Sequence, residues 1–211
     1  MRKVVITALT AAVTCACSES TRTPATPTEL TAPLQVQAAQ PDGIAKNHNT
    51  HLSGDQEIVL PPPPAGAPTP ADSRAQGQAN FNVSDDGQTV EYKLIASNIN
   101  NVFMAHIHCG VPGMNGPIVV WLFPSTVPTP GPPGGGRHDG VLAEGTFTNA
   151  NVIPRDASDA CPGGVSSLAD VLAKIKAHGT YVNVHTNDGN ATPNEGPGDF
   201  PGGEIRGQLD K

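Results

Sequence analysis

Apolar and polar residues alternate with a period of two through most of the chain after residue 51, and this alternation restricts the fold more than any other feature. In residues 75–83, AQGQANFNV, the alanine, phenylalanine and valine side chains share one face and the amide side chains share the other. Residues 89–96, TVEYKLIA, repeat the pattern, and the intervening DDG at residues 85–87 is typical of a hairpin turn. Such alternation indicates strands with one buried face. We therefore expect these two segments to pair as antiparallel strands.

Further segments are typical of strands, and one is typical of a helix. Residues 166–179, SSLADVLAKIKAHG, space leucine, valine and isoleucine as in an amphipathic helix, with Ser167 and Asp170 as a capping pair. Residues 117–123, PIVVWLF, are apolar on both faces and are expected to form a central strand. The other expected strands are residues 51–59, 102–108, 140–148, 180–186 and 203–209. Together these segments predict an all-β fold, a Greek-key β-sandwich of about eight antiparallel strands with one short amphipathic helix.

The N-terminal composition is typical of an export signal. Two basic residues precede an apolar run, VVITALTAAV, and small residues then predict cleavage after Ala16. Residues 1–16 are therefore expected to be a signal peptide, and the apolar run is too short to cross a membrane as a helix. Cleavage would make Cys17 the new N-terminal residue, the lipidated position of bacterial lipoproteins, although Thr14 stands where those proteins usually have leucine.

The segment after the signal, residues 17–48, is rich in threonine and proline and has no apolar periodicity. Such a composition buries too little apolar surface to offset the entropy of ordering, so this segment is expected to be a disordered tether. The folded domain then comprises residues 49–211. We expect the protein to be exported, and either lipid-anchored in the cell envelope or secreted.

Charge and cysteine content narrow the partners and the compartment. The formal charge is −7, and loss of residues 1–16 leaves 10 basic and 19 acidic residues, a net charge of −9. This acidity disfavours nucleic acid and anionic membrane surfaces, so contact with a membrane is expected only through a lipid anchor. Cys109 and Cys161 are the pair left in the domain. In an exported protein such a pair predicts a disulfide, and two free thiols are the alternative.

Three histidines fall on strand faces opposite the small apolar side chains. His106 and His108 share a face with Met104, and His185 takes the corresponding position in residues 181–186, YVNVHT. If the two strands are neighbours, the three imidazoles converge. Neutral imidazole is a ligand for zinc and copper, and the Met104 thioether would favour copper(I). The sequence therefore predicts a copper or zinc site at His106, His108 and His185.

A structural role could explain the same histidines. Imidazoles on a half-exposed sheet face hydrogen-bond to carboxylates and carbonyls, and Glu204 and Arg206 are candidate partners on the last expected strand. The chain contains no G-x-S-x-G elbow, no H-E-x-x-H and no phosphate-binding glycine loop. No catalytic residue and no organic cofactor are therefore assigned.

Four motifs, in this order and at this spacing, resemble the CHRD (chordin-type) domain: HLSGDQEIVLPPPP at 51–64, AHIHCGVPGMNGPIVVWL at 105–122, YVNVHT at 181–186 and GGEIRGQL at 202–209. The resemblance covers roughly residues 49–209. It implies an extracellular all-β module whose ligand in microbial proteins is undefined. Because the chain lacks the cysteine-rich repeats of chordin, growth-factor binding is not expected.

The chain is also similar, at the level of the fold, to copper/zinc superoxide dismutase. His106, His108, His185 and Arg206 follow the order of two adjacent copper ligands, a later copper ligand and an arginine near the active site in that family. No clear bridging histidine follows the H-x-H, and no zinc-loop cluster of histidine and aspartate is present. The likeness therefore bears on the fold and on a metal position rather than on an activity.

Two functions from different classes follow. The first is a non-enzymatic binding module of the cell envelope that takes an extracellular ligand which the sequence does not name. The alternative is a copper- or zinc-binding protein with a role in metal sequestration or in redox chemistry like that of superoxide dismutase.

Overall fold

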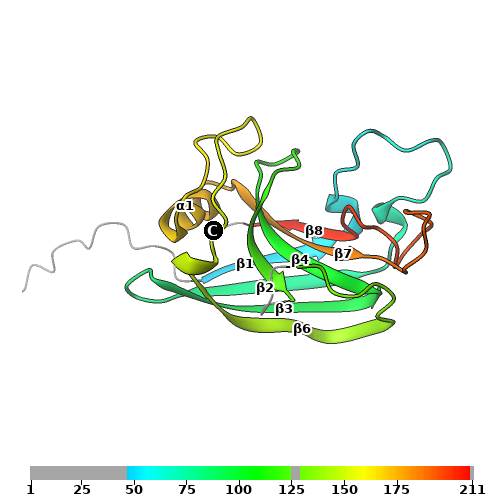
Figure 1. The fold of residues 1–211 in the computed structure, drawn as a ribbon, viewed down its shortest axis with the longest axis horizontal. Helices are drawn as coiled ribbons and strands as arrows, with labels where there is room; N and C mark the ends of the chain where they lie inside the picture. Colours follow the sequence, from blue (N-terminus) through cyan, green and yellow to red (C-terminus); the bar gives the residue numbers. More distant parts are fainter. Residues whose placement is uncertain (1–46, 125–128, 210–211) are drawn as a thin grey trace, which may run out of the picture. The chain divides into compact units, whose positions relative to one another are not determined.

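The strands of the computed structural model, which describes residues 47–124 and 129–209, all belong to one antiparallel sheet (Figure 1). The strands are β1 (Asn47–Ser53), β2 (Gln76–Val83), β3 (Thr89–Asn100), β4 (Val102–Cys109), β5 (Ile118–Phe123), β6 (Arg137–Thr148), β7 (Thr180–Thr186) and β8 (Ile205–Gln208). Their order in the sheet is β5-β4-β7-β8-β1-β2-β3-β6. One α-helix, α1 (Leu168–Lys176), and three short 3-10 helices complete the described elements, so the expected all-β fold with one helix is confirmed.

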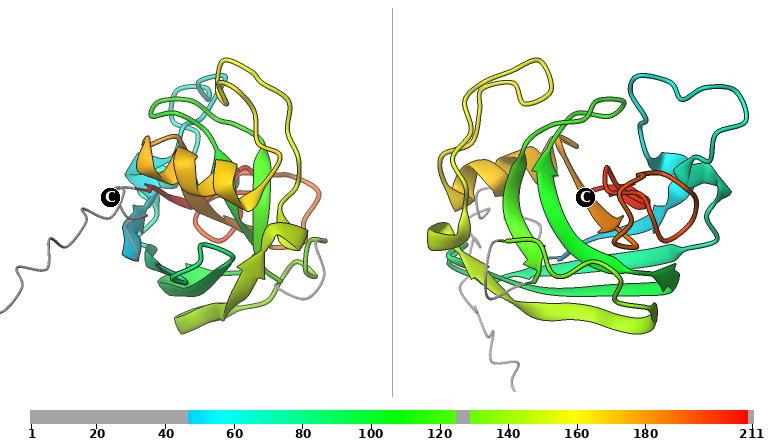
Figure 2. Two further views of the ribbon diagram at one scale, coloured as in Figure 1. Left: turned by 90° about the vertical axis from the view of Figure 1, so that its left-hand side faces the viewer. Right: turned by 45° about the vertical axis from the view of Figure 1, so that its right-hand side comes forward.

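The sheet curls until its two end strands, β5 and β6, approach each other and nearly close it around the core (Figure 2). The Tyr92 hydroxyl on β3 donates a hydrogen bond of 2.9 Å to the Leu122 carbonyl on β5, which joins opposite parts of the sheet. A buried hydroxyl of this kind needs a partner, because leaving it unpaired costs about 1–3 kcal/mol. The two halves of the sheet therefore pack on each other as the layers of a β-sandwich do.

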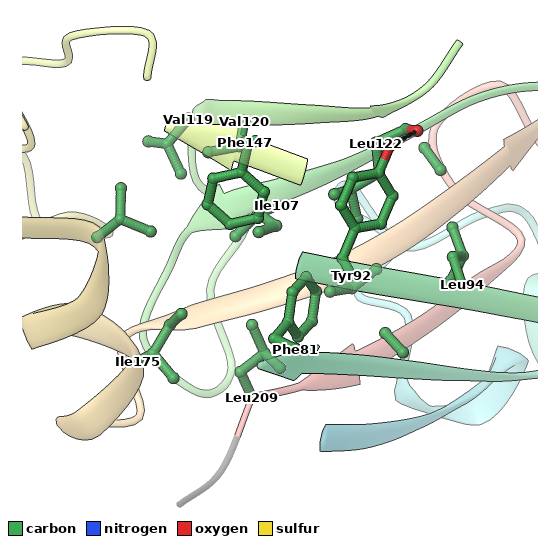
Figure 3. Close-up of a cluster of buried hydrophobic side chains, with 14 of the residues drawn as sticks. Phe81, Tyr92, Leu94, Ile107, Val119, Val120, Leu122, Phe147, Ile175 and Leu209 are labelled. Carbon is green, nitrogen blue, oxygen red and sulfur yellow. Dashed lines mark hydrogen bonds between the residues drawn. The ribbon is translucent and has the colours of Figure 1, made fainter. Parts of the chain in front are cut away.

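The core fills the inside of this curl (Figure 3). Phe81, Tyr92 and Phe147, from β2, β3 and β6, form an aromatic cluster in which the ring of Phe147 lies 6.3 Å from that of Phe81 and 6.1 Å from that of Tyr92. Ile107 and Leu122, from β4 and β5, approach from the opposite half of the sheet, and both are fully buried. Burial of each such side chain stabilises the fold by about 1.5–3 kcal/mol. The alternating sequence pattern supplies the apolar side chains for this burial.

The hairpin and the helix form as the local sequence predicts. β2 and β3 pair in register, with Phe81 opposite Tyr92, and residues 85–87 lie in the turn. The Ser167 side chain accepts a hydrogen bond from the Asp170 backbone N–H at the start of α1. The buried side of α1 consists of the four apolar residues of the predicted stripe, Leu168, Val171, Leu172 and Ile175.

The prediction of a central strand at residues 117–123 is wrong. β5 lies at one end of the strand order and pairs only with β4 among the described strands. Its other edge is covered by the segment after β6, where the Ile153 backbone N–H donates to the Val119 carbonyl at 2.9 Å and Arg155 Nε donates to the Ile118 carbonyl at 2.7 Å. Val119, Val120 and Leu122 of β5 are fully buried, and a segment that pairs with the free edge leaves a strand at the end of the sheet as apolar as a central one.

The first strand also differs from its prediction. β1 begins at Asn47, two residues before the expected domain start, and ends at Ser53, so residues 54–59 are not strand. The chain turns into a 3-10 helix at Gly54–Gln56, where a Cβ on Gly54 would collide with the Pro70 carbonyl. The predicted signal peptide at residues 1–16, Cys17 and the tether up to residue 46 lie outside the described residues. Within the described ranges, no helix is long and apolar enough to cross a membrane.

The predicted disulfide is confirmed. Cys109, at the end of β4, is bonded to Cys161, and their Cα atoms lie 5.3 Å apart. Both residues are fully buried in the core cluster. The bond ties the segment before α1 to the end of the strand that carries His106 and His108.

Loss of the disulfide is expected to lower the free energy of unfolding by about 4 kcal/mol, because a cross-link between residues 52 positions apart reduces the entropy of the unfolded chain. The measurement is guanidinium unfolding of the Cys109→Ala/Cys161→Ala protein beside the wild type. Reduced wild-type protein, which keeps both side chains, separates the cross-link from the loss of packing. Equal unfolding midpoints for the oxidised and reduced proteins would contradict the prediction.

Candidate metal site

Pairing between β4 and β7 brings the three predicted histidines together. In this antiparallel pair Met104 lies opposite His185, His106 opposite Asn183, and His108 opposite Tyr181. Residues opposite one another project to the same face of a sheet. The intervening residues of both strands project to the other face and belong to the core: Ala105, Ile107, Val182 and Val184.

The histidine face is buried as deeply as the core face. The exposed fractions are 0% for His106, 8% for His108 and 5% for His185. Chain segments near Gly116 and Pro201 approach this face and accept hydrogen bonds from the imidazoles. The face is therefore buried rather than half-exposed, and the hydrogen bonds of His108 and His185 to loop carbonyls are of the kind that the structural alternative expects.

Two of the imidazoles are oriented by backbone carbonyls. His108 Nδ1 lies 2.8 Å from the Gly116 carbonyl oxygen, and His185 Nδ1 lies 2.8 Å from the Pro201 carbonyl oxygen. A carbonyl only accepts, so Nδ1 carries the proton in both rings and Nε2 keeps its lone pair. Metal-binding histidines are commonly held in this way, by a hydrogen bond from the ring nitrogen that does not bind the metal.

The His106 imidazole is the most deeply buried of the three and contacts the His185 imidazole directly. His106 Nδ1 is 3.3 Å from His185 Nε2, and the His106 ring meets the Trp121 ring edge to face with centroids 4.2 Å apart. The Nε2 atoms of His106 and His108 are buried and have no hydrogen-bond partner among the residues that the structure describes. Buried polar atoms are rarely left unpaired, so these two nitrogens indicate a missing partner.

Asn183 adds a further lone pair to the same place. Its Oδ1 lies 2.9 Å from His185 Nε2. With Nδ1 of His185 donating to Pro201, both of these facing atoms are acceptors. Either a half-turn of the amide, which presents its NH2 group, or a cation bound between the lone pairs resolves the conflict.

His106, His108 and His185 each offer one ring nitrogen, and the three atoms lie within 4.8 Å of one another. Ligands at 2.0–2.1 Å around a tetrahedral zinc ion lie about 3.3 Å apart. The separation of 3.3 Å between His106 Nδ1 and His185 Nε2 matches this value. The His106 and His185 rings already have the spacing of two ligands of one ion, and the His108 ring would complete the set by moving toward them from within 4.8 Å.

Burial keeps all three imidazoles neutral. It lowers the pKa of His106 to about 2, with repulsion from His185 and His108 adding to the shift. Burial likewise lowers the pKa of His108 to about 3 and that of His185 to about 4, although the carbonyls of Gly116 and Pro201 oppose these shifts. Because metal binding requires deprotonated imidazole, the folded protein presents its ligands ready to bind.

Comparison with known families agrees with this architecture. The sequence matches the CHRD domain family over residues 48–192, which is more than half of the 211 residues. The protein belongs to the CHRD domain family. The match includes the strands that carry all three histidines, whereas β8 lies beyond it. No curated protein and no solved structure matches the chain.

The acidic and basic partners expected for the histidines have other roles in this CHRD domain. The Glu204 carboxylate accepts hydrogen bonds from Ser73, Thr186 and the Gly198 backbone N–H. The Arg206 guanidinium donates to the Asn115 side chain and the Met114 carbonyl. The backbone carbonyls of Gly116 and Pro201 take the place assigned to these residues.

The sequence analysis did not assign a role to Asn183, Gly116 or Pro201. Asn183 shares the period-two face of His185, so the alternation could have placed it beside His106. The two carbonyls lie in glycine- and proline-rich loops, and no side-chain pattern marks a backbone acceptor there.

The metal-free CHRD domain is expected to lose stability as pH falls below 6.5. In the unfolded chain histidine titrates near pH 6.5, whereas the folded pKa values are about 2, about 3 and about 4. Between pH 6.5 and about 4 the unfolded state therefore binds more protons, and each histidine lowers the free energy of unfolding by about 1.4 kcal/mol per pH unit. Urea unfolding of chelator-treated protein across this range measures the slope.

The matched variant is His108→Gln, which keeps a polar side chain but does not titrate. Its slope of stability against pH is expected to be smaller by about 1.4 kcal/mol per pH unit. An unchanged slope would show that His108 titrates alike in the folded and unfolded states.

Proposed function

We propose that this CHRD-domain protein is an exported, non-enzymatic binding protein whose ligand is a transition-metal ion, copper or zinc, held by His106, His108 and His185. One observation carries the proposal: three buried neutral imidazoles converge within 4.8 Å, and two of them have an Nε2 atom with no partner in the described chain. Burial without a partner costs about 1–3 kcal/mol for such an atom, and an ion bound to His108 Nε2 would remove that cost at this residue.

A sequestering role is favoured over redox chemistry like that of superoxide dismutase. The order of residues in that family suggests Arg206 as the arginine near the metal. Here the Arg206 guanidinium carbon lies 3.4 Å from the centre of the Tyr181 ring, and the other face of that ring stacks on His108 with centroids 4.7 Å apart. Tyr181 thus stands between Arg206 and the histidines, and Arg206 is only 2% exposed. Arg206 is therefore not accessible to attract a small anion such as superoxide toward the histidines.

Export is supported by two independent features. The first is the basic and apolar composition of residues 1–16 with a small-residue cleavage site. The second is the buried Cys109–Cys161 disulfide, since such bonds form and persist in oxidising compartments. Cys17 then becomes a candidate for lipid attachment, which would place the domain at the cell envelope.

Metal binding is tested by titrating untagged, chelator-treated protein with zinc or copper(II) in a calorimeter. The wild type is expected to bind one ion with micromolar or tighter affinity. His108→Ala is expected to abolish binding, because it removes a nitrogen that the Gly116 carbonyl orients. His51→Ala, an exposed histidine of β1 outside the cluster, is the matched control and is expected to bind as the wild type does.

Thermal melting shows whether a variant that fails to bind metal is still folded. Metal at about 100 times its dissociation constant is expected to stabilise the wild type and His51→Ala by about 2.7 kcal/mol and to leave folded His108→Ala unchanged. If neither ion binds the folded wild type at micromolar concentration and neutral pH, the proposal fails.

Lipid attachment is tested by labelling cells of a bacterial expression host with palmitate and separating membrane from soluble fractions. The wild type is expected to carry the label and to fractionate with membranes, whereas Cys17→Ser is expected to lose both. Cys15→Ser, two residues away and within the predicted signal, is expected to keep the label. An unlabelled, soluble wild type would favour cleavage and release without an anchor.

A further inference from the structure

A second candidate site lies at the end of the sheet away from α1, where the loop after β1 meets the loop before β8 (Figure 1). Residues 57–70 and 193–203 supply most of its wall, and Asn115 completes it. The cavity has a volume of about 440 Å³. Ligand pockets in proteins span about 300–1,000 Å³, so this cavity suits a small organic molecule. None of the three clustered histidines lines it.

The wall of the cavity is largely apolar and rich in proline. Ile58, Val59, Leu60 and Phe200 line it together with several prolines from both loops. Val59 is 39% exposed and Leu60 is 68% exposed, and they are two of the four large apolar side chains that are exposed in the described ranges. Proline fixes its own backbone angle, so these loops lose little entropy when a ligand is ordered against them.

Glu57 is the one ionisable side chain in the wall of the cavity, beside two asparagines. Glu57 lines it, and its Oε1 atom is buried without a hydrogen-bond partner among the described residues. The carboxyl lies against the backbone of Gly203, where φ is +129° and a Cβ would collide with it. The Glu57 carboxyl, which belongs to the first loop, is therefore held in position by the backbone of the second loop.

Glu57 forms no ion pair within the described residues. The charge of Arg206 acts on Glu57, but the guanidinium donates its hydrogen bonds to Asn115, Met114 and Gln208. Burial raises the pKa of Glu57 to about 8, although Arg206, Asn183 and the Ile58 backbone N–H oppose the shift. A cation placed beside the carboxyl would stabilise its ionised form.

We propose that this cavity binds a small organic molecule with an ammonium group on a compact apolar body, the ammonium donating a hydrogen bond to Glu57 Oε1. The apolar body would cover Val59 and Leu60 and remove them from water. The net charge of −7 favours the approach of a cation. The proposal does not require a metal ion at the histidines, although Pro201 lines the cavity and also accepts a hydrogen bond from His185.

Three probes with one apolar body test the chemistry: cyclohexylmethylammonium, cyclohexylmethanol and cyclohexanecarboxylate. Each is titrated into ¹⁵N-labelled protein in the presence of a chelator, and amide shifts of the two loops are followed. The ammonium probe is expected to bind at millimolar or lower concentration, and the alcohol about tenfold more weakly, because it forms no charged hydrogen bond. Carboxylate binding as tight as ammonium binding would overturn the proposal.

Variants then locate the site. Glu57→Gln, which keeps the shape of the side chain, is expected to weaken ammonium binding about tenfold and to leave alcohol binding unchanged. Val59→Ser is expected to weaken both about fivefold, since it removes apolar contact. Val141→Ser is the matched control, because Val141 is a valine of similar exposure, 45%, that does not line the cavity. If Glu57→Gln and Val59→Ser both melt and bind as the wild type does, the proposal fails.

The same titration of His108→Ala separates this site from the metal site. Ammonium binding equal to that of the wild type is expected, whatever the result for metal. Loss of ammonium binding in folded His108→Ala would overturn the independence of the two sites.

Discussion

The rest of the structure depends on the antiparallel pairing of β4 with β7. Side chains such as Ile107 and Val182 from one face of this pair join the core. The other face carries the three imidazoles and Asn183, and it is buried as well. A strand pair buried on both faces needs cover on both, so the curled sheet encloses one face and the glycine- and proline-rich loops close over the other. The unusual loop content of this chain is thus a requirement of the sheet it surrounds.

Burial of so many polar groups on one face has to be offset by hydrogen bonds, because a buried polar group without a partner is costly. One short loop, around residues 114–116, meets much of this need. Its backbone accepts from Arg206 through Met114 and from His108 through Gly116, and its Asn115 side chain accepts from Arg206. The Tyr181 ring lies between the Arg206 guanidinium and the His108 imidazole and stacks on both. The loop and the stack fix His108 more firmly than strand geometry alone would.

Much of the fold could be predicted from local pattern. Alternation predicted β2 and β3, and the capping pair Ser167 and Asp170 predicted the start of α1. The cysteine pair in a chain expected to be exported predicted the disulfide. Period two also placed the three histidines on the faces where the structure has them. Position within the sheet was not predictable in the same way. β5 reads as central because both its faces are apolar, yet cover from the segment around Ile153 gives it the same composition.

Sequence patterns could not predict that β4 and β7 are neighbours or that loop carbonyls accept from the histidines. Whether His185 approaches His106 depends on β4 and β7 being neighbours, although 70 residues of chain separate the ends of the two strands. The Gly116 and Pro201 carbonyls depend on the path of the backbone, which side-chain chemistry does not encode. The polar atoms that orient the imidazoles are therefore the part of the site that only the three-dimensional structure reveals.

The disulfide has a consequence for the histidines that reaches beyond stability. Cys109 directly follows His108, and its bond to Cys161 fixes the last residue of β4. In the thiol form that end of the strand is held by non-covalent contacts alone, and the imidazole next to it has more room to leave its place beside Tyr181. Thiol oxidation and the arrangement of the histidine cluster are therefore expected to be linked, so that a newly made chain would reach the arrangement described here only where its cysteines become oxidised.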